Sequence, residues 1–130
     1  MNLMKKYAIY AIAILQDCMP NKIIPKVEIT QAKSYAGRCV VKRIGYKNMM
    51  IKATIRLSSF NHMDVPSLMS YEDHIEIIDT IAHELAHVVV MPHCKEHSEL
   101  TEDFKSLIIS YFEVLGFLEK KKELKEEVAN

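Results

Sequence analysis

Residues 73 to 90 repeat apolar side chains at helical spacing, and this segment constrains the fold more than any other part of the chain. The apolar positions are Ile75, Ile78, Ala82, Leu85 and Val89. They fall three or four residues apart and so share one face of a helix. Ser70 and Asp73 resemble a capping box at its start. Pro92 ends the pattern, because proline lacks an amide proton and disfavours helical geometry at the residue before it.

The polar side of this predicted helix carries the sequence His83-Glu84-Leu85-Ala86-His87. Residues four apart lie on one face, so the rings of His83 and His87 can converge on a single ion. Neutral imidazole suits Zn²⁺, and Glu84 lies where it can accept a proton from a water molecule beside the ion. The alternative is a chance match on an exposed helix, but both histidines lie outside the apolar stripe. We therefore predict a Zn²⁺ site with Glu84 as general base.

A third ligand must come from beyond the helix break, because a catalytic zinc ion usually has three protein ligands and an open fourth position. His93 lies just after Pro92, where the chain can turn back toward the site, and is the preferred candidate. His97 is the alternative, and both could take part if the last helix begins early. Acidic residues are further candidates, as ligands or as hydrogen-bond partners of ligands. These are Glu96, Glu99, Glu102 and Asp103.

Around the motif, the sequence predicts a small α+β domain. The expected elements are a helix at 3–18, strands at 26–30, 39–43 and 50–57, the motif helix, and a final helix at 98–115. Turn-forming residues 45 to 48 separate the second and third strands, which we expect to form a hairpin. Gly116 is a natural end for the final helix. The domain would span residues 1 to 117, and residues 118 to 130 would form a charged tail.

Composition narrows the class of protein. Seventeen basic residues balance seventeen acidic ones, so net charge provides no pull toward nucleic acid or an anionic membrane, whatever local patches exist. The three cysteines include no CxxC pair, which favours a reducing, cytoplasmic setting over a disulfide framework. The apolar run from Tyr7 to Leu15 follows two lysines, as in a signal peptide, but no cleavage site follows and the run is too short to span a bilayer. We therefore expect a cytoplasmic protein with no membrane partner.

Four other residues are weaker candidates for a functional role. We expect Cys94 to be a small buried hydrophobic residue, and His62 and His74 to lie at the surface or in loops. Tyr71 could stabilise an oxyanion, but nothing in the sequence places it beside the histidines.

Taken in order, several segments resemble the SprT-like metalloprotease domain, the family that includes the Spartan DNA–protein crosslink proteases. The matching segments are Val27-Glu28-Ile29-Thr30, Ala36-Gly37-Arg38-Cys39, Ile55-Arg56-Leu57-Ser58 and Thr80 to His87, the last similar to the family's T-x-x-H-E-x-x-H helix. The resemblance covers residues 3 to 115. It implies a minimal zincin-like fold and a zinc-dependent endopeptidase acting on proteins or peptides. Through the crosslink proteases it also implies DNA as a partner.

The chain departs from the family pattern after the predicted third ligand. Relatives carry glycine directly after that histidine and an aromatic residue four positions after it, where this chain has Cys94 and His97. Many relatives also have a cysteine-rich zinc ribbon, and this chain has none. A zinc-stabilised binding module without catalytic turnover is therefore the alternative function. A third hypothesis, an adaptor that binds nucleic acid directly, is disfavoured by the neutral net charge.

Overall fold

The computed structural model describes residues 2 to 119 of the 130-residue chain, and this part forms an α+β domain. Within it lie three helices, α1 (Leu3–Ile14), α2 (Tyr71–Val89) and α3 (Lys95–Val114), and three strands, β1 (Lys26–Thr30), β2 (Gly37–Ile44) and β3 (Met49–Ser58). Short 3-10 turns occupy Gln16–Cys18, Pro20–Lys22 and Pro66–Leu68. The predicted class and the predicted order of elements are confirmed.

The three strands form one mixed sheet in the order β1-β3-β2, so β3 is central. β1 runs parallel to β3, with Val27 opposite Ile55. β2 runs antiparallel to β3, which confirms the predicted hairpin, and a β-bulge interrupts the pairing between Lys42 and Arg43. β1 has the predicted bounds, whereas β2 and β3 extend one or two residues beyond theirs at each end.

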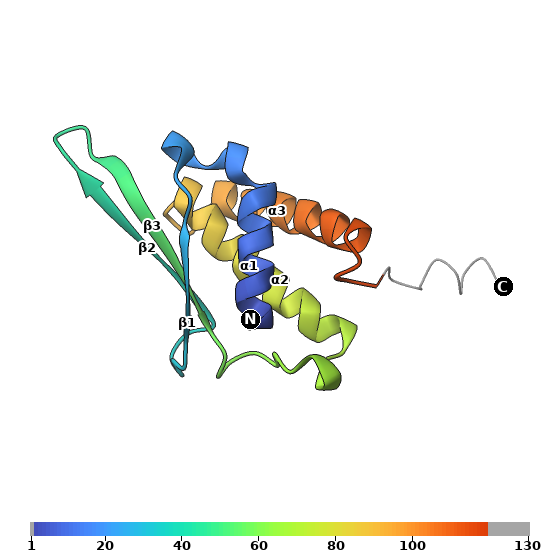
Figure 1. The fold of residues 1–130 in the computed structure, drawn as a ribbon. Coiled ribbons are helices and arrows are strands. Elements are labelled where there is room, and N and C mark those ends of the chain that lie inside the picture. The colour runs from blue at the N-terminus through green and yellow to red at the C-terminus, as the bar shows by residue number, and fades with distance from the viewer. Residues whose placement is uncertain (1, 120–130) are drawn as a thin grey trace.

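All three helices lie on one side of the sheet (Figure 1). α1 packs on β1, α2 packs on β2 and β3, and α3 packs on α2. The β2–β3 hairpin extends past the helices, as Figure 1 shows. The core, which lies between the sheet and the helices and among the helices themselves, contains large side chains that are almost fully buried, among them Tyr7, Ile55, Leu57, Ile81, Leu85, Ile108 and Phe112.

α2 is buried on more than the single stripe that periodicity predicts. Of the predicted stripe, Ile78, Ala82 and Leu85 are buried, but Val89 is exposed. Further buried positions are Ile77, Ile81, Glu84, Ala86, His87 and Val88. The reason is that α2 lies between the sheet on one side and α3 on the other. This position encloses the polar motif as well as the apolar residues.

The capping box at the start of α2 is present as predicted, although the helix begins at Tyr71, two residues earlier than expected. The Asp73 amide donates to the Ser70 hydroxyl oxygen at 3.3 Å, and the Ser70 amide donates to the Asp73 carboxylate at 2.8 Å. These bonds satisfy amide protons that have no partner within the helix.

The other two helices also differ from prediction, α1 at its end and α3 mainly at its start. α1 ends at Ile14 rather than at residue 18, because the chain changes to shorter-range bonds in which the Cys18 amide donates to the Leu15 carbonyl. α3 begins at Lys95 rather than at residue 98. Cys94 is its extended N-terminal cap, and the carbonyl of Cys94 accepts the first helical hydrogen bond.

The predicted tail begins inside the folded domain. Leu118, its first residue, is buried and packs in the core. Residues 120 to 130 lie outside the described part of the chain. No helix within residues 2 to 119 has the length and apolar character needed to cross a membrane.

Candidate metal centre

The rings of His83, His87 and His93 converge where the end of α2 meets the following loop. Their Nε2 atoms form a triangle with sides of 3.2 Å (His83–His87), 3.3 Å (His83–His93) and 2.9 Å (His87–His93). Tetrahedral zinc at about 2.0–2.1 Å from each nitrogen would separate the nitrogens by roughly 3.3 Å. The three histidines therefore lie close enough together to bind one metal ion. Pro92 ends α2 and lets the chain bring His93 back to the helix.

The electrostatic environment keeps two of these rings neutral. Burial lowers the pKa of His83 to about 4, with a further contribution from the nearby His87. Burial also lowers the pKa of His87, and the nearby His97 and His93 lower it further. The Nδ1 of His87 lies 3.3 Å from the Val90 carbonyl, to which it donates, so Nε2 retains its lone pair. Neutral rings with free Nε2 lone pairs are what a metal ion requires.

His97, the alternative third ligand, lies behind His87 and not in the triangle. Its side chain is 3% exposed, and its ring stacks on that of His87 with centroids 3.8 Å apart and planes at 20°. Its Nε2 lies 3.1 Å from the His83 carbonyl oxygen and must donate, because a carbonyl only accepts. That nitrogen is therefore engaged with the backbone of α2. The contacts of His97 hold the histidine-bearing turns of α2 in place.

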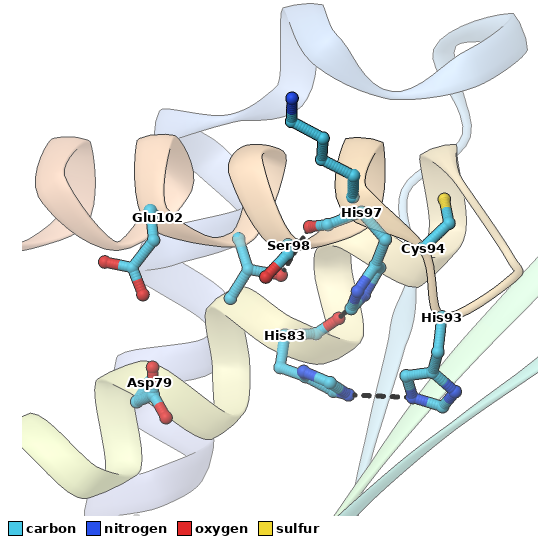
Figure 2. Close-up of a pocket in the computed structure, with 9 residues that line it drawn as sticks. Asp79, His83, His93, Cys94, His97, Ser98 and Glu102 are labelled. Atoms are coloured by element: carbon cyan, nitrogen blue, oxygen red, sulfur yellow. Dashed lines mark hydrogen bonds between the residues drawn. The ribbon is translucent and has the colours of Figure 1, made fainter.

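The acidic candidates on α3 lie outside the histidine triangle. Within residues 2 to 119, no carboxylate joins the three histidines in a set of ligand atoms close enough to share an ion. The side chains of Glu96, Glu99, Glu102 and Asp103 are all exposed. Oε1 of Glu99 lies 3.9 Å from Nζ of Lys95, with which it forms an ion pair. Figure 2 shows Glu102 on α3 and Asp79 on α2, which line a cavity of about 500 Å³ together with His83, His93 and His97. These carboxylates border the approach to the site.

Glu84, the predicted general base, is buried beside the cluster. Its side chain is 5% exposed and lines a second cavity, of about 240 Å³, together with all three histidines. Burial raises its pKa to about 7, since removal from water disfavours the charged carboxylate. A carboxyl group with this pKa can both accept and release a proton near neutral pH.

The backbone of β2 lies close to α2 at Gly37. A Cβ atom at this position would lie 2.6 Å from the Thr80 methyl carbon and 2.8 Å from Oε2 of Glu84. Gly37 is therefore required by space, because a side chain at this position would collide with Glu84 and with Thr80. Gly37 lies in one of the segments that resemble the SprT-like pattern, but the order of residues alone does not show that Gly37 contacts Glu84.

Cys39, two residues along β2, lines the same cavity. Burial, and then the charge of Glu84, raises the pKa of its thiol to about 12. Within residues 2 to 119, its sulfur does not join the three histidines in the set of ligand atoms close enough to share an ion. Cys94 is exposed at the start of α3, so the prediction that it is buried is wrong. Its position as an N-terminal cap turns it away from the core.

His62 connects the loop after β3 to the motif helix, a role that the sequence did not reveal. Its Nδ1 lies 2.8 Å from the Ser58 carbonyl oxygen, and its Nε2 lies 2.9 Å from the Thr80 hydroxyl. It is in a loop, as expected, but it is half-buried. Through Thr80 it fixes the turn of α2 that precedes Glu84.

The remaining candidates lie away from the cluster. Tyr71 precedes His83 by twelve residues on α2, or about 18 Å at the helical rise. His74 is half-buried near the same end of α2, and its Nδ1 lies 2.8 Å from the Tyr7 hydroxyl. The Tyr7 hydroxyl donates its proton to the Phe117 carbonyl at 3.0 Å. The hydroxyl oxygen therefore accepts a hydrogen bond from Nδ1 of His74. His74 thus serves packing and not the site.

The site combines three converging imidazoles, a buried carboxyl group and an edge strand on one side. Comparison with protein-family models, curated protein sequences and solved structures found no match to this chain. What the site does must therefore be argued from its own geometry.

Proposed function

We propose that this protein is a zinc-dependent endopeptidase in which His83, His87 and His93 hold the ion. The observation that carries the proposal is the triangle of Nε2 atoms, whose sides of 2.9–3.3 Å suit a single tetrahedral zinc ion. Three imidazoles leave a fourth position for substrate or water, as catalytic zinc sites do. The helix with its motif beside a small sheet also supports a zincin-like fold.

Glu84 has the position and the pKa for general acid–base catalysis. Zinc bound at the triangle would polarise the scissile carbonyl group and lower the pKa of a nearby water molecule. Glu84 accepts a proton as the water oxygen bonds to the carbonyl carbon. It then returns the proton to the amine as the carbon–nitrogen bond breaks. Without the ion, burial alone raises the pKa of Glu84 to about 7. The charge of a bound zinc ion would lower that pKa and favour the carboxylate form, which accepts the proton.

The free edge of β2 supports an extended peptide as the substrate. β2 pairs only with β3 within the described part of the chain, and Gly37, Arg38 and Cys39 line the cavity that also contains Glu84. An extended segment can add to such an edge through backbone hydrogen bonds. This pose would place a scissile carbonyl beside the histidines, and it selects flexible or unfolded segments over folded ones.

The alternative function, a zinc-stabilised binding module, leaves Glu84 without a purpose. Burying a carboxyl group costs folding free energy unless it is compensated, and the three imidazoles alone would hold a structural ion. A buried carboxyl group beside the ligands is therefore better explained by catalysis. Glu84→Gln separates the two functions, because it removes the proton acceptor while preserving shape.

The test combines metal content with peptide cleavage. Elemental analysis of the untagged protein should find one zinc ion per chain in the wild type, Glu84→Gln and His97→Ala, and almost none in His93→Ala. Cleavage of an unfolded casein should be lost in Glu84→Gln and retained in Glu99→Gln, a control with the same chemical change on the exposed face of α3. Stoichiometric zinc with equal cleavage by Glu84→Gln would rule out the catalytic role. Zinc without cleavage in the wild type would favour the binding module.

A further inference from the structure

Charge is strongly segregated in this neutral chain. Residues 29 to 63, which include β2 and β3, contain seven basic residues and no acidic ones. Residues 71 to 114, which form α2 and α3, contain ten acidic and two basic residues. α2 and α3 lie on one side of the sheet (Figure 1), so their acidic residues lie on the opposite side of the domain from the outer face of β2 and β3. A protein of this kind has an orientation in the field of a charged surface.

The outer face of the hairpin, away from the helices, places like charges opposite each other. Lys42 pairs directly with Lys52, and Arg38 pairs directly with Arg56. Directly opposed residues have Cβ atoms only about 5 Å apart, so each like-charged pair destabilises the hairpin. Glu28 offsets Arg56 through a hydrogen bond of 2.9 Å. Glu28 attracts Lys52 at longer range, but within residues 2 to 119 neither Lys42 nor Lys52 forms a salt bridge. An external anion would therefore relieve their repulsion.

The end of the same hairpin is apolar. Ile44 lies opposite Met49 in the last pair before the turn, and their side chains are 48% and 51% exposed. Tyr46, within the turn, is 94% exposed. Side chains alternate along a strand, so Ile44 shares the outer face with Lys42 and lies about 7 Å further toward the tip. We call Ile44, Tyr46 and Met49 the apolar tip.

We propose that the β2–β3 hairpin docks this protein on an anionic membrane surface, with the apolar tip inserted and Lys42 and Lys52 on the lipid headgroups. Peripheral apolar segments enter the interface by about 5–10 Å, which matches the spacing between tip and lysines. Tyrosine, with an apolar ring and a polar hydroxyl, suits this depth. The acidic helices α2 and α3 lie on the side of the domain away from the membrane. The anionic lipids would repel them, and this repulsion would orient the domain. Docking of this kind needs no membrane-spanning helix and stands whether or not the histidine cluster is catalytic.

Two other partners fit the lysines but not the tip. Nucleic acid would bind the basic residues through its phosphates, yet interfaces with nucleic acid are polar and would leave Ile44 and Met49 in water. Binding to the acidic helices of a second copy of this chain would also leave Ile44 and Met49 in water. The apolar pair at the end of a basic hairpin therefore favours lipid. The expectation of no membrane partner rested on the neutral total charge and on the short apolar run at Tyr7 to Leu15, and neither of these reveals the segregation of charge.

The test uses a fluorescent reporter that the sequence makes available. The chain contains no tryptophan, so Tyr46→Trp introduces a single one at a fully exposed position where folding is not at risk. Its emission should shift to the blue on vesicles that mix phosphatidylcholine with phosphatidylserine. It should not shift on phosphatidylcholine alone, and high salt should reverse the shift, because the lysines act through screened charge.

Paired variants separate the hairpin from bulk charge. In the Tyr46→Trp background, Lys42→Gln with Lys52→Gln should weaken partitioning onto the anionic vesicles about 25-fold, since each lysine near such a surface contributes roughly fivefold. Lys5→Gln with Lys95→Gln makes the same change in net charge at exposed helical positions, and should leave partitioning unchanged. Ile44→Ser with Met49→Ser should abolish the blue shift while circular dichroism stays that of the wild type.

Four outcomes would overturn the proposal. The first is the absence of a blue shift on anionic vesicles, and the second is an equal loss in the control pair. The third is a shift with a DNA or RNA oligonucleotide but not with vesicles, which would make the hairpin a nucleic-acid surface. The fourth is a shift that grows with protein concentration in the absence of lipid, which would make it a contact between copies.

Discussion

Gly37→Ala is the change that most directly tests whether β2 positions Glu84. Gly37 has no unusual backbone conformation, so its substitution acts only through the space that a methyl group occupies. The new Cβ would lie 2.6 Å from the Thr80 methyl carbon, 2.8 Å from Oε2 of Glu84 and 3.0 Å from its Cγ. Contacts below 3.0 Å cannot persist, so at least one of these groups must move.

The structure indicates which group moves and at what cost. α2 lies between the sheet and α3, and the side chain of Thr80 is β-branched and held by His62, so the carboxylate of Glu84 is the easiest to displace. Overpacking of this kind costs about 1–3 kcal/mol of unfolding free energy. A displacement of about 1 Å at a reacting group costs roughly 100-fold in rate. The histidines are not among the nearest neighbours, so zinc should stay bound.

Three measurements on one preparation check this prediction: urea unfolding followed by circular dichroism, zinc content, and casein cleavage. Gly45→Ala is the matched control, because Gly45 has a φ of 77° and open space around it. It should lose about 1–2 kcal/mol through backbone strain yet keep full activity. Adding Thr80→Ser to Gly37→Ala removes the closest contact and should restore part of the stability. Wild-type stability and activity in Gly37→Ala would refute the packing argument, and loss of zinc would refute the claim that only Glu84 is displaced.

Three further predictions concern the site and the fold. His97→Ala should weaken zinc binding about 10–100-fold in competition with a chelator, because it removes the ring stacked on His87 and the donor to the His83 carbonyl; complete loss would instead make His97 a ligand. Ser70→Ala should lower the unfolding free energy by about 1 kcal/mol in urea titration, and no change would show that the capping box is not formed in solution. Phe112→Ala should cost about 3–5 kcal/mol, because its ring is fully buried against α1 and α2, and a cost below about 1 kcal/mol would contradict the packing of α3.

The parts of the fold that sequence could predict are those controlled by neighbours along the chain. The spacing of Ile78, Ala82 and Leu85 shows a helix, Ser70 and Asp73 show its start, and these features survive in the structure. The convergence of His83 and His87 follows from helical spacing alone. Hairpin formation by β2 and β3 follows from two strand patterns around a short turn.

The parts that sequence could not predict depend on contacts between distant segments. Spacing alone left His93 and His97 open, because the path after Pro92 depends on where α3 begins. That start lies at Lys95, since Cys94 caps the helix in an extended conformation. His93 then precedes the helix, and His97 falls in its first turn, where it packs behind His87. The burial of Glu84, which raises its pKa, likewise depends on β2 lying over α2.

The basic face of the hairpin shows the same limit most clearly. In residues 38 to 44, apolar side chains occur on both faces of the strand. Val40 and Ile44 lie on one face, and Cys39 and Val41 lie on the other. Periodicity alone therefore cannot say which set faces the core. Pairing with β3 decides, because Cys39 and Val41 lie opposite Ile55 and Ala53, both of which are buried. A shift of one residue in this register would turn Arg38 toward α2, where Gly37 and Cys39 now lie, and would bury its charge. The hydrophobic contacts that fix this register thus leave the lysines and the apolar tip exposed to solvent, where they can contact a membrane.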